Sequence, residues 1–184
     1  PSSAASDVYK RQEHICSVTT DNYMGALQAA SLLIRDHCDV LIHINADVPK
    51  IIPAYNRIRA FEDTCKEHHV PYELNLNVCG DSYQELFSQM KIIFADIDEK
   101  YPGQKKGVFL ANDTYANMFL NLIFQKYGCL PDTYELVGFD NSPIASEAIL
   151  PITTIGQQIE VIAHTSMELL VPVSYTHIRA HETS

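Results

Sequence analysis

The chain of 184 residues alternates short β-rich runs with segments of helical periodicity, and this alternation restricts its possible folds more than any other feature. The helical segments, where apolar residues recur every three or four positions, are 21–37, 54–68, 82–100, 113–128 and 157–170. The β-rich runs between them are 40–44, 72–78, 107–111, 134–140 and 152–155. Strands that alternate with helices indicate right-handed β-α-β units. The sequence therefore predicts an α/β fold with a mostly parallel sheet and helices on both faces.

Residues that favour helix ends support these boundaries. Asp21 precedes the first helical segment and can accept a hydrogen bond as its N-cap. Ser82 and Glu85 have the spacing of a capping box, and Gly128 can close the fourth helix in a left-handed conformation. Asp113 is expected to cap the fourth helix at its N-terminus rather than to bind a ligand.

Polar residues follow the ends of several predicted strands. Ligands of open parallel sheets bind outside the carboxyl ends of the strands, so these residues are the natural candidates for a site. Each one alone is more readily explained by turn or cap chemistry. Together, carboxylates and amides on one edge of a sheet suit a polyhydroxyl ligand. The candidates are Asn45, Asp47, Asp81, Asn112, Asp113, Asp140 and Asn141.

Both ends of the chain resemble translated DNA adapters. The opening "PSSAASDVYKRQ" matches the translation of a transposase end sequence with its adapter arm, as used in sequencing libraries. The closing run from 173 to 183 matches the opposite arm, with Ile178 in place of Leu. We therefore expect residues 1–12 and 172–184 to be adapter-derived tails, and 13–171 to be one domain truncated at both ends. A zinc site at His177 and His181, four residues apart, is the alternative that this origin makes improbable.

The charge of the chain argues against nucleic-acid binding. Taking Lys10, Arg11 and Arg179 from the 13 basic residues, and Asp7 and Glu182 from the 23 acidic ones, leaves a net charge near −11. A surface of this sign repels phosphates, so this stretch is not expected to bind DNA directly. The sequence holds no apolar run of 18 residues, and no contact with a membrane is expected.

The five cysteines follow no CxxC spacing, which favours free thiols in a reducing, cytoplasmic compartment. Cys65, His68 and His69 have the spacing of one helix face, but the polar end of a helix explains them better than a metal does. No phosphate-binding glycine loop, nucleophile elbow or HExxH motif occurs. We therefore expect no metal, no cofactor and no enzymatic activity.

Five stretches in order, "VTTDNYMGA", "NRIRAF", "FLANDTYA", "LPDTYELVGFDN" and "PITTIGQQ", resemble the effector-binding domain of the LacI/GalR family of transcriptional repressors. The related sugar-binding proteins share its type I periplasmic-binding fold. The resemblance covers 13–171 and implies most of a C-terminal subdomain. It also implies that a DNA-binding helix-turn-helix, a hinge helix and most of a first subdomain lie upstream.

The resemblance implies which residues bind the ligand. Arg57 of "NRIRAF" falls at the family's arginine that holds ligand oxygens, and Asn112 and Asp140 fall at two further sugar contacts. Asp81 lies near a position that often carries an aromatic ring, so hydrogen bonding would replace stacking there. The alternative for Arg57 is a solvated helix residue paired with Glu62 or Asp63.

One departure concerns the end of the first helix. Asp36 stands where the family usually has a glycine, so we expect Asp36 to adopt a left-handed cap.

These observations favour a sensory domain of a cytoplasmic repressor, homodimeric, that binds a small effector, a sugar, in a cleft between two subdomains. Operator DNA would be bound only through the missing N-terminal module. The alternative is the solute-binding protein of a sugar importer, which has the same fold. A helix-turn-helix or a signal peptide upstream would distinguish the two.

Overall fold

The computed structural model describes residues 21–46, 55–157 and 160–167. Residues 21–157 form one compact unit, and residues 160–167, which are helical, belong to a second. The expected adapter tails and the candidate Asp47 lie outside the described residues, as do His177 and His181. The first unit carries every other candidate residue.

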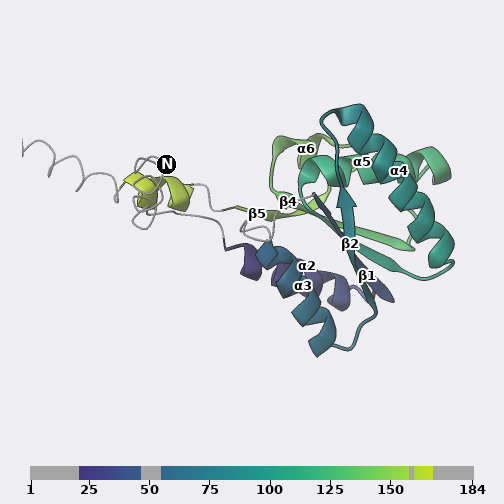
Figure 1. Ribbon diagram of the computed structural model, residues 1–184, viewed down its shortest axis with the longest axis horizontal. Coiled ribbons are helices and arrows are strands. Elements are labelled where there is room, and N and C mark those ends of the chain that lie inside the picture. Colours follow the sequence, from purple (N-terminus) through teal and green to yellow (C-terminus); the bar gives the residue numbers. More distant parts are fainter. Residues whose placement is uncertain (1–20, 47–54, 158–159, 168–184) are drawn as a thin grey trace, which may run out of the picture. The chain divides into compact units, whose positions relative to one another are not determined.

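A five-stranded parallel sheet forms the centre of this first unit (Figure 1). Its strands run in the order β2-β1-β3-β4-β5, and all four neighbouring pairs are parallel. The strands are β1 (Val40–Ala46), β2 (Tyr72–Val78), β3 (Lys106–Leu110), β4 (Tyr134–Asp140) and β5 (Thr153–Gly156). The predicted α/β fold with a mostly parallel sheet is confirmed.

Helices cover both faces of the sheet (Figure 1). The helices are α2 (Asn22–Arg35), α3 (Tyr55–Glu67), α4 (Tyr83–Lys100), α5 (Asp113–Tyr127) and α6 (Pro143–Glu147). The first two pack on one face and α4 and α5 on the other. The short helix α6 was not predicted, since five residues are too few to show a helical period.

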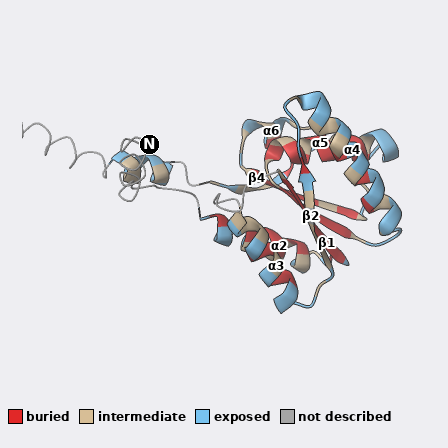
Figure 2. Ribbon diagram, in the orientation of Figure 1, coloured by how far each residue is buried: buried red, intermediate tan, exposed pale blue. Residues whose placement is uncertain are grey.

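The core lies in two layers, one on each side of the sheet, and Figure 2 shows the buried strands between them. Ile42 and Val108 face α4 and α5, whereas Leu41 and Phe109 face α2 and α3. Burial on both faces explains why these strands read as continuous apolar runs. Each fully buried side chain of this size contributes roughly 1.5–3 kcal/mol.

Gly25 allows α2 to lie directly against β4. A Cβ atom at this position would stand 2.8 Å from the Phe139 ring, closer than packed carbon atoms approach. The first helix therefore needs a glycine here for its close packing on the sheet.

The predicted caps at Ser82 and Gly128 are confirmed, whereas the predicted left-handed cap at Asp36 is not. The Ser82 hydroxyl accepts from the Glu85 amide (3.3 Å), and Gly128 closes α5 with φ of 74°. The prediction for Asp36 was wrong: Asp36 has φ of −82°, and the left-handed residue is His37, with φ of 57°. The chain thus turns one residue later than the family pattern indicated.

The strand order places a topological switch point between β1 and β3. The chain proceeds from β1 to β2 on one side and then returns to β3 on the other. Crossovers that leave neighbouring strands in opposite directions open a crevice at their carboxyl ends, which is where ligands of such sheets bind. No helix within the described residues is both long and apolar enough to cross a membrane.

Candidate functional site

Arg57 lies at this edge of the sheet, in the first turn of α3. Its Nη1 donates a hydrogen bond to the carbonyl oxygen of Ala111, directly after β3, at 2.6 Å. Its guanidinium carbon stands 4.3 Å from the centre of the Phe139 ring on β4. A cation over an aromatic face is attracted by the ring quadrupole. Arg57 is therefore held across the ends of two neighbouring strands.

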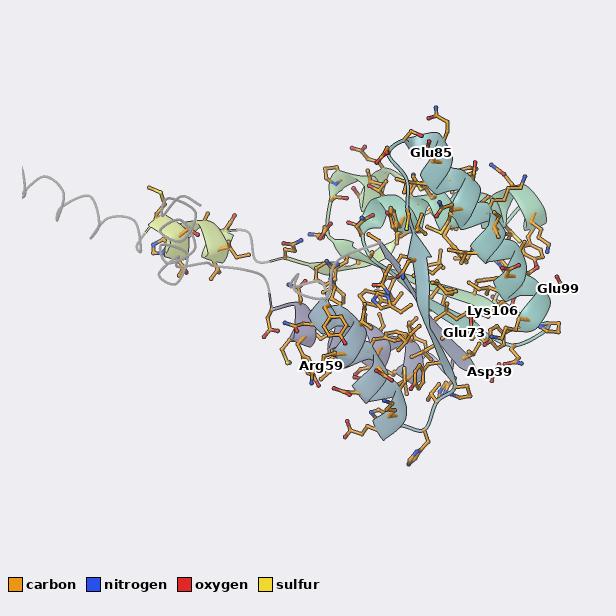
Figure 3. The ribbon with its side chains drawn as sticks, in the orientation of Figure 1. Asp39, Arg59, Glu73, Glu85, Glu99 and Lys106 are labelled. Carbon is orange, nitrogen blue, oxygen red and sulfur yellow. The ribbon has the colours of Figure 1, made fainter. Side chains whose placement is uncertain are left out.

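The alternative partners of Arg57 are bound elsewhere. Glu62 forms an ion pair with Lys66 (2.7 Å), and Asp63 accepts from the Tyr23 hydroxyl (3.2 Å). Arg59, two residues after Arg57, is labelled on the outer side of α3 in Figure 3. Arg57 is thus a half-buried side chain directed at the sheet rather than a solvated helix residue.

Asp140 ends β4 and faces the same region. Its Oδ1 accepts a hydrogen bond from Nε2 of Gln157. Burial raises the pKa of Asp140, and the charge of Asp113 adds to this, while the Gln157 hydrogen bond and the charge of Arg57 lower it. Burial lowers the pKa of Arg57, and Asp140 opposes that shift. The structure therefore brings Arg57 and Asp140 close enough to stabilise each other's charged forms.

The turn after β4 has an unusual backbone. Asp140 and Asn141 have φ angles of 104° and 52°, in the region that L-residues rarely adopt. Such conformations persist only where surrounding contacts enforce them, and they concentrate at functional sites.

Asp113 supplies those contacts. Its Oδ2 accepts from the Ser142 amide (2.7 Å) and its Oδ1 from the Thr154 hydroxyl (2.6 Å). The Thr154 oxygen in turn accepts from the Asn141 amide (3.2 Å). The prediction that Asp113 caps α5 was wrong, since its carboxylate is buried and ties the turn to β5. Sequence alone does not show contacts over 29 and 41 residues.

Asn112 is the residue that caps α5. Its Oδ1 accepts from the Tyr115 amide at 2.9 Å. Because it directly follows Ala111, which binds Arg57, Asn112 lies at the same edge of the sheet. Because the side-chain oxygen of Asn112 accepts from the helix backbone, its side-chain amide nitrogen is the group left for a ligand.

Asp81 follows the carboxyl end of β2, the edge strand beside β1, and is not bonded to these three residues. It is exposed in the connection between β2 and α4, and its amide donates to Oε2 of Glu85 (2.9 Å). Within the described part of the chain, no hydrogen bond or ion pair joins Asp81 to Arg57, Asn112 or Asp140.

Gln157 was missed by the sequence analysis. It directly follows β5 and donates to Asp140. The rule that selected the other candidates, a polar residue just after a strand, would have found it.

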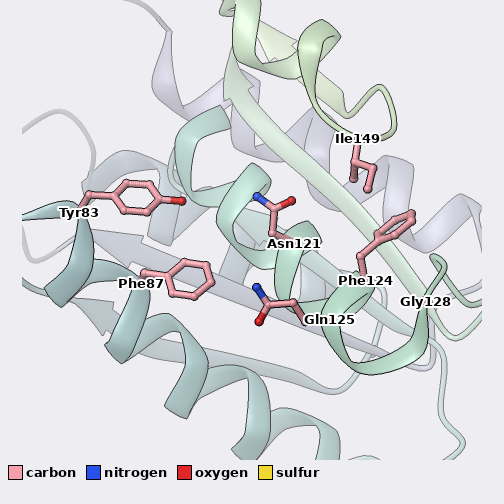
Figure 4. A pocket seen from close by; sticks show the side chains of 7 residues that line it. All are labelled: Tyr83, Phe87, Asn121, Phe124, Gln125, Gly128 and Ile149. Atoms are coloured by element: carbon pink, nitrogen blue, oxygen red, sulfur yellow. The ribbon is translucent and has the colours of Figure 1, made fainter.

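A separate hollow of about 460 Å³ lies on the other face of the sheet (Figure 4). Tyr83 and Phe87 of α4 line it together with Asn121, Phe124, Gln125, Gly128 and Ile149. It has no charged lining residue, in contrast to the region around Arg57. In the described ranges, no group of three His, Cys, Asp or Glu side chains could hold a metal ion.

The region around Arg57 thus gathers its guanidinium, the Asp140 carboxylate and the side-chain amides of Asn112 and Gln157 from four different segments of the chain. These groups donate and accept hydrogen bonds, and they include no nucleophile paired with a base. Planar guanidinium and carboxylate groups can each bind two neighbouring oxygens, as in a polyhydroxyl compound.

Known proteins of similar sequence and fold include several transcriptional regulators. A ribose operon repressor from Halalkalibacterium halodurans is 26% identical over 160 residues, which are 86% of this chain and 46% of the repressor. A solved periplasmic binding protein/LacI transcriptional regulator from Alkaliphilus metalliredigens, complexed with D-xylulofuranose, is 23% identical with a TM-score of 0.68. That match covers 86% of this chain and 57% of the other. The transcription regulator CcpA of Lactococcus lactis is 22% identical with a TM-score of 0.72, covering 90% and 58%.

This chain therefore spans about half the length of the relatives that it matches. The solved structures share its fold. The family model described as "Periplasmic binding protein-like domain" matches residues 33–184, which is most of the sequence. The chain belongs to the family of periplasmic binding protein-like domains.

Proposed function

We propose that this chain is the ligand-sensing domain of a LacI/GalR-type transcriptional repressor and that its effector is a sugar. The observation that carries the proposal is the meeting of Arg57 and Asp140 at the carboxyl edge of the sheet, beside the Asn112 cap. Two relatives support the ligand class, since one is a ribose operon repressor and another was solved with D-xylulofuranose.

In this proposal Arg57 donates to two neighbouring sugar oxygens, Asp140 accepts from a hydroxyl, and the Asn112 amide donates to a third oxygen. Asp81 contributes at the rim. Because burial strengthens both charged groups' hydrogen bonds, the Arg57–Asp140 pair supplies most of the orientation.

The sugar regulates DNA binding only if it binds two arrangements of the complete repressor with different affinity. The proposal therefore places the sugar in a cleft between two subdomains of a cytoplasmic homodimer, with operator DNA bound by an N-terminal helix-turn-helix. The acidic composition of this chain supports a separate DNA-binding module.

A solute-binding protein of a sugar importer is the second candidate. The observation that favours a repressor is that three cysteines of the described part of the chain, Cys38, Cys65 and Cys129, form no disulfide. Exported proteins of oxidising compartments rarely keep several free thiols.

The test is a titration of the 15N-labelled chain with D-ribose, D-xylulose and D-glucose, followed by NMR. Because this chain supplies only one side of the proposed cleft, we expect weak binding, in which at least one sugar at high concentration shifts the Arg57 side-chain resonance together with the backbone resonances of Asn112 and Asp140. Arg57→Lys should weaken that response strongly, since lysine cannot bind two oxygens in a fork, whereas Arg59→Lys, on the outer side of the same helix, is the matched control. If no sugar shifts these resonances, the proposed function is wrong.

A further inference from the structure

Two buried polar side chains of β1 make none of the contacts that hold Arg57 and Asp140. His43 is fully buried and Asn45 is 5% exposed. Nε2 of His43 and Nδ2 of Asn45 have no hydrogen-bond partner among the described residues. A buried donor or acceptor without a partner costs roughly 1–3 kcal/mol, so two on one strand call for an explanation.

The two atoms have complementary chemistry. Nδ1 of His43 lies 3.0 Å from the Phe109 carbonyl oxygen, which can only accept, so Nδ1 carries the proton. Burial lowers the pKa of His43 to about 4, with a smaller contribution from the charge of Arg57, so the ring is neutral at pH 7. Nε2 is then a bare acceptor, whereas Nδ2 of Asn45 is a donor.

Both side chains project from the same face of β1. Residues two apart in a strand share a face, and His43 stacks on Phe109 and packs against the tilted ring of Phe61 on the α3 side of the sheet. Asn45 therefore also faces α3, the helix that carries Arg57.

Asn45 lies at the switch point itself. Ile44 pairs with Leu110 in the β1–β3 register, so the next residue along, Asn45, stands beside Ala111. Ala111 is the residue whose carbonyl oxygen binds Arg57. Since neighbouring strands are about 4.8 Å apart, Asn45 is roughly one strand spacing from the Arg57 anchor.

We propose that Asn45 and His43 form a donor–acceptor pair that binds one O–H group, the Asn45 amide donating to its oxygen and the His43 Nε2 accepting its proton. An O–H group satisfies both atoms at once, which neither an anion nor a cation does. The group is a hydroxyl of the sugar or an ordered water beneath it. That the O–H group belongs to a sugar rests on the proposed function, whereas the donor–acceptor pair itself does not.

The experiment uses Asn45→Leu, which keeps the size of the side chain and removes the donor. Urea unfolding gives the stability of the sugar-free protein, and NMR titration with D-ribose, D-xylulose and D-glucose gives the dissociation constant. Asn121→Leu on α5, on the other face of the sheet, is the matched control and should leave sugar binding unchanged.

If the O–H belongs to the sugar, Asn45→Leu should raise the dissociation constant about tenfold without lowering sugar-free stability. If it belongs to water, the variant should lose stability and keep its sugar affinity. In either case His43→Phe should be strongly non-additive with Asn45→Leu in the affected quantity, because both variants remove the same bound group.

The pair is refuted if Asn45→Leu changes neither quantity, or if its effect simply adds to that of His43→Phe. If a sugar shifts the Arg57 resonance and its dissociation constant is unchanged by Asn45→Leu, the proposed function stands. The O–H group bound by Asn45 and His43 then does not belong to the sugar. If no sugar binds at all, the proposed function and the sugar source both fail, and the stability measurements alone decide between bound water and no site.

Discussion

Removing the Asp113 carboxylate should destabilise the domain more than its position in the first turn of a helix suggests. The side chain is 1% exposed and accepts hydrogen bonds from Ser142 and Thr154. Hydrogen bonds to a charged group contribute about 1.5–3 kcal/mol each, so Asp113→Ala should cost roughly 3–6 kcal/mol. For a chain of this size that corresponds to a fall in Tm on the order of 10 °C.

A substitution of Gly138 on β4 offers a second way to perturb the Asp113 carboxylate. A Cβ atom there would stand 2.3 Å from Oδ1 of Asp113, so Gly138→Ala must displace the carboxylate. We expect a loss of about 1–3 kcal/mol in the native background. With Asp113→Ala already present, the next contacts are the Ala116 Cβ and the Cα of residue 113, both at 3.4 Å, and the same alanine should cost little. Urea unfolding followed by circular dichroism measures all four combinations.

The exposed Asp132→Ala is the control and should change stability by less than about 0.5 kcal/mol. The predicted coupling between positions 113 and 138 is roughly 1–3 kcal/mol. Additive losses of stability in the double variant would show that an alanine at position 138 does not displace this carboxylate. A loss below about 1 kcal/mol in Asp113→Ala would refute the stabilising role of its two hydrogen bonds.

Two further predictions concern titration and thiol reactivity. Burial lowers the folded-state pKa of His43 from 6.5 to about 4. Between these pH values His43 binds a proton in the unfolded chain but not in the folded chain. Stability should fall as pH decreases from 6.5 to 4, by about 3 kcal/mol, and His43→Phe should flatten this part of a pH-dependent unfolding curve; an unchanged curve would contradict a neutral buried ring. Burial raises the pKa of Cys38 to about 11 and that of Cys65 to about 12, so maleimide labelling followed by mass spectrometry should modify the exposed Cys129 before either of them. Equal labelling rates at these three thiols would show that the two buried ones are accessible.

The sequence predicted the long elements of the fold well because both of its signals are local. Strand β2 and strand β4 begin and end where the apolar runs do, and the helical periods locate α4 and α5 within a residue. The Ser82 cap was recognisable for the same reason, since donor and acceptor are three residues apart.

The site was predicted less completely because its contacts join distant residues. The strand-end rule selected Asp140, whose charge influences Arg57, but the placement of Arg57 depends on the Ala111 carbonyl, 54 residues away. Asp113 was misassigned because a carboxylate at the start of a helix is typical of an N-cap. Its actual hydrogen bonds, to Ser142 and Thr154, join residues far apart in the sequence, and a local pattern does not show them. His43 read as one more residue of an apolar strand, and only the packed structure shows which of its nitrogens has a partner.

The contact between Gly25 and Phe139 links helix packing to the site. One part of the Phe139 ring meets α2 and its face carries the Arg57 guanidinium, so the ring is a wall shared by both. In the proposed sensing role, substitutions of Gly25 should therefore weaken the response to sugar as substitutions of Arg57 do, although Gly25 is not itself proposed to contact the sugar.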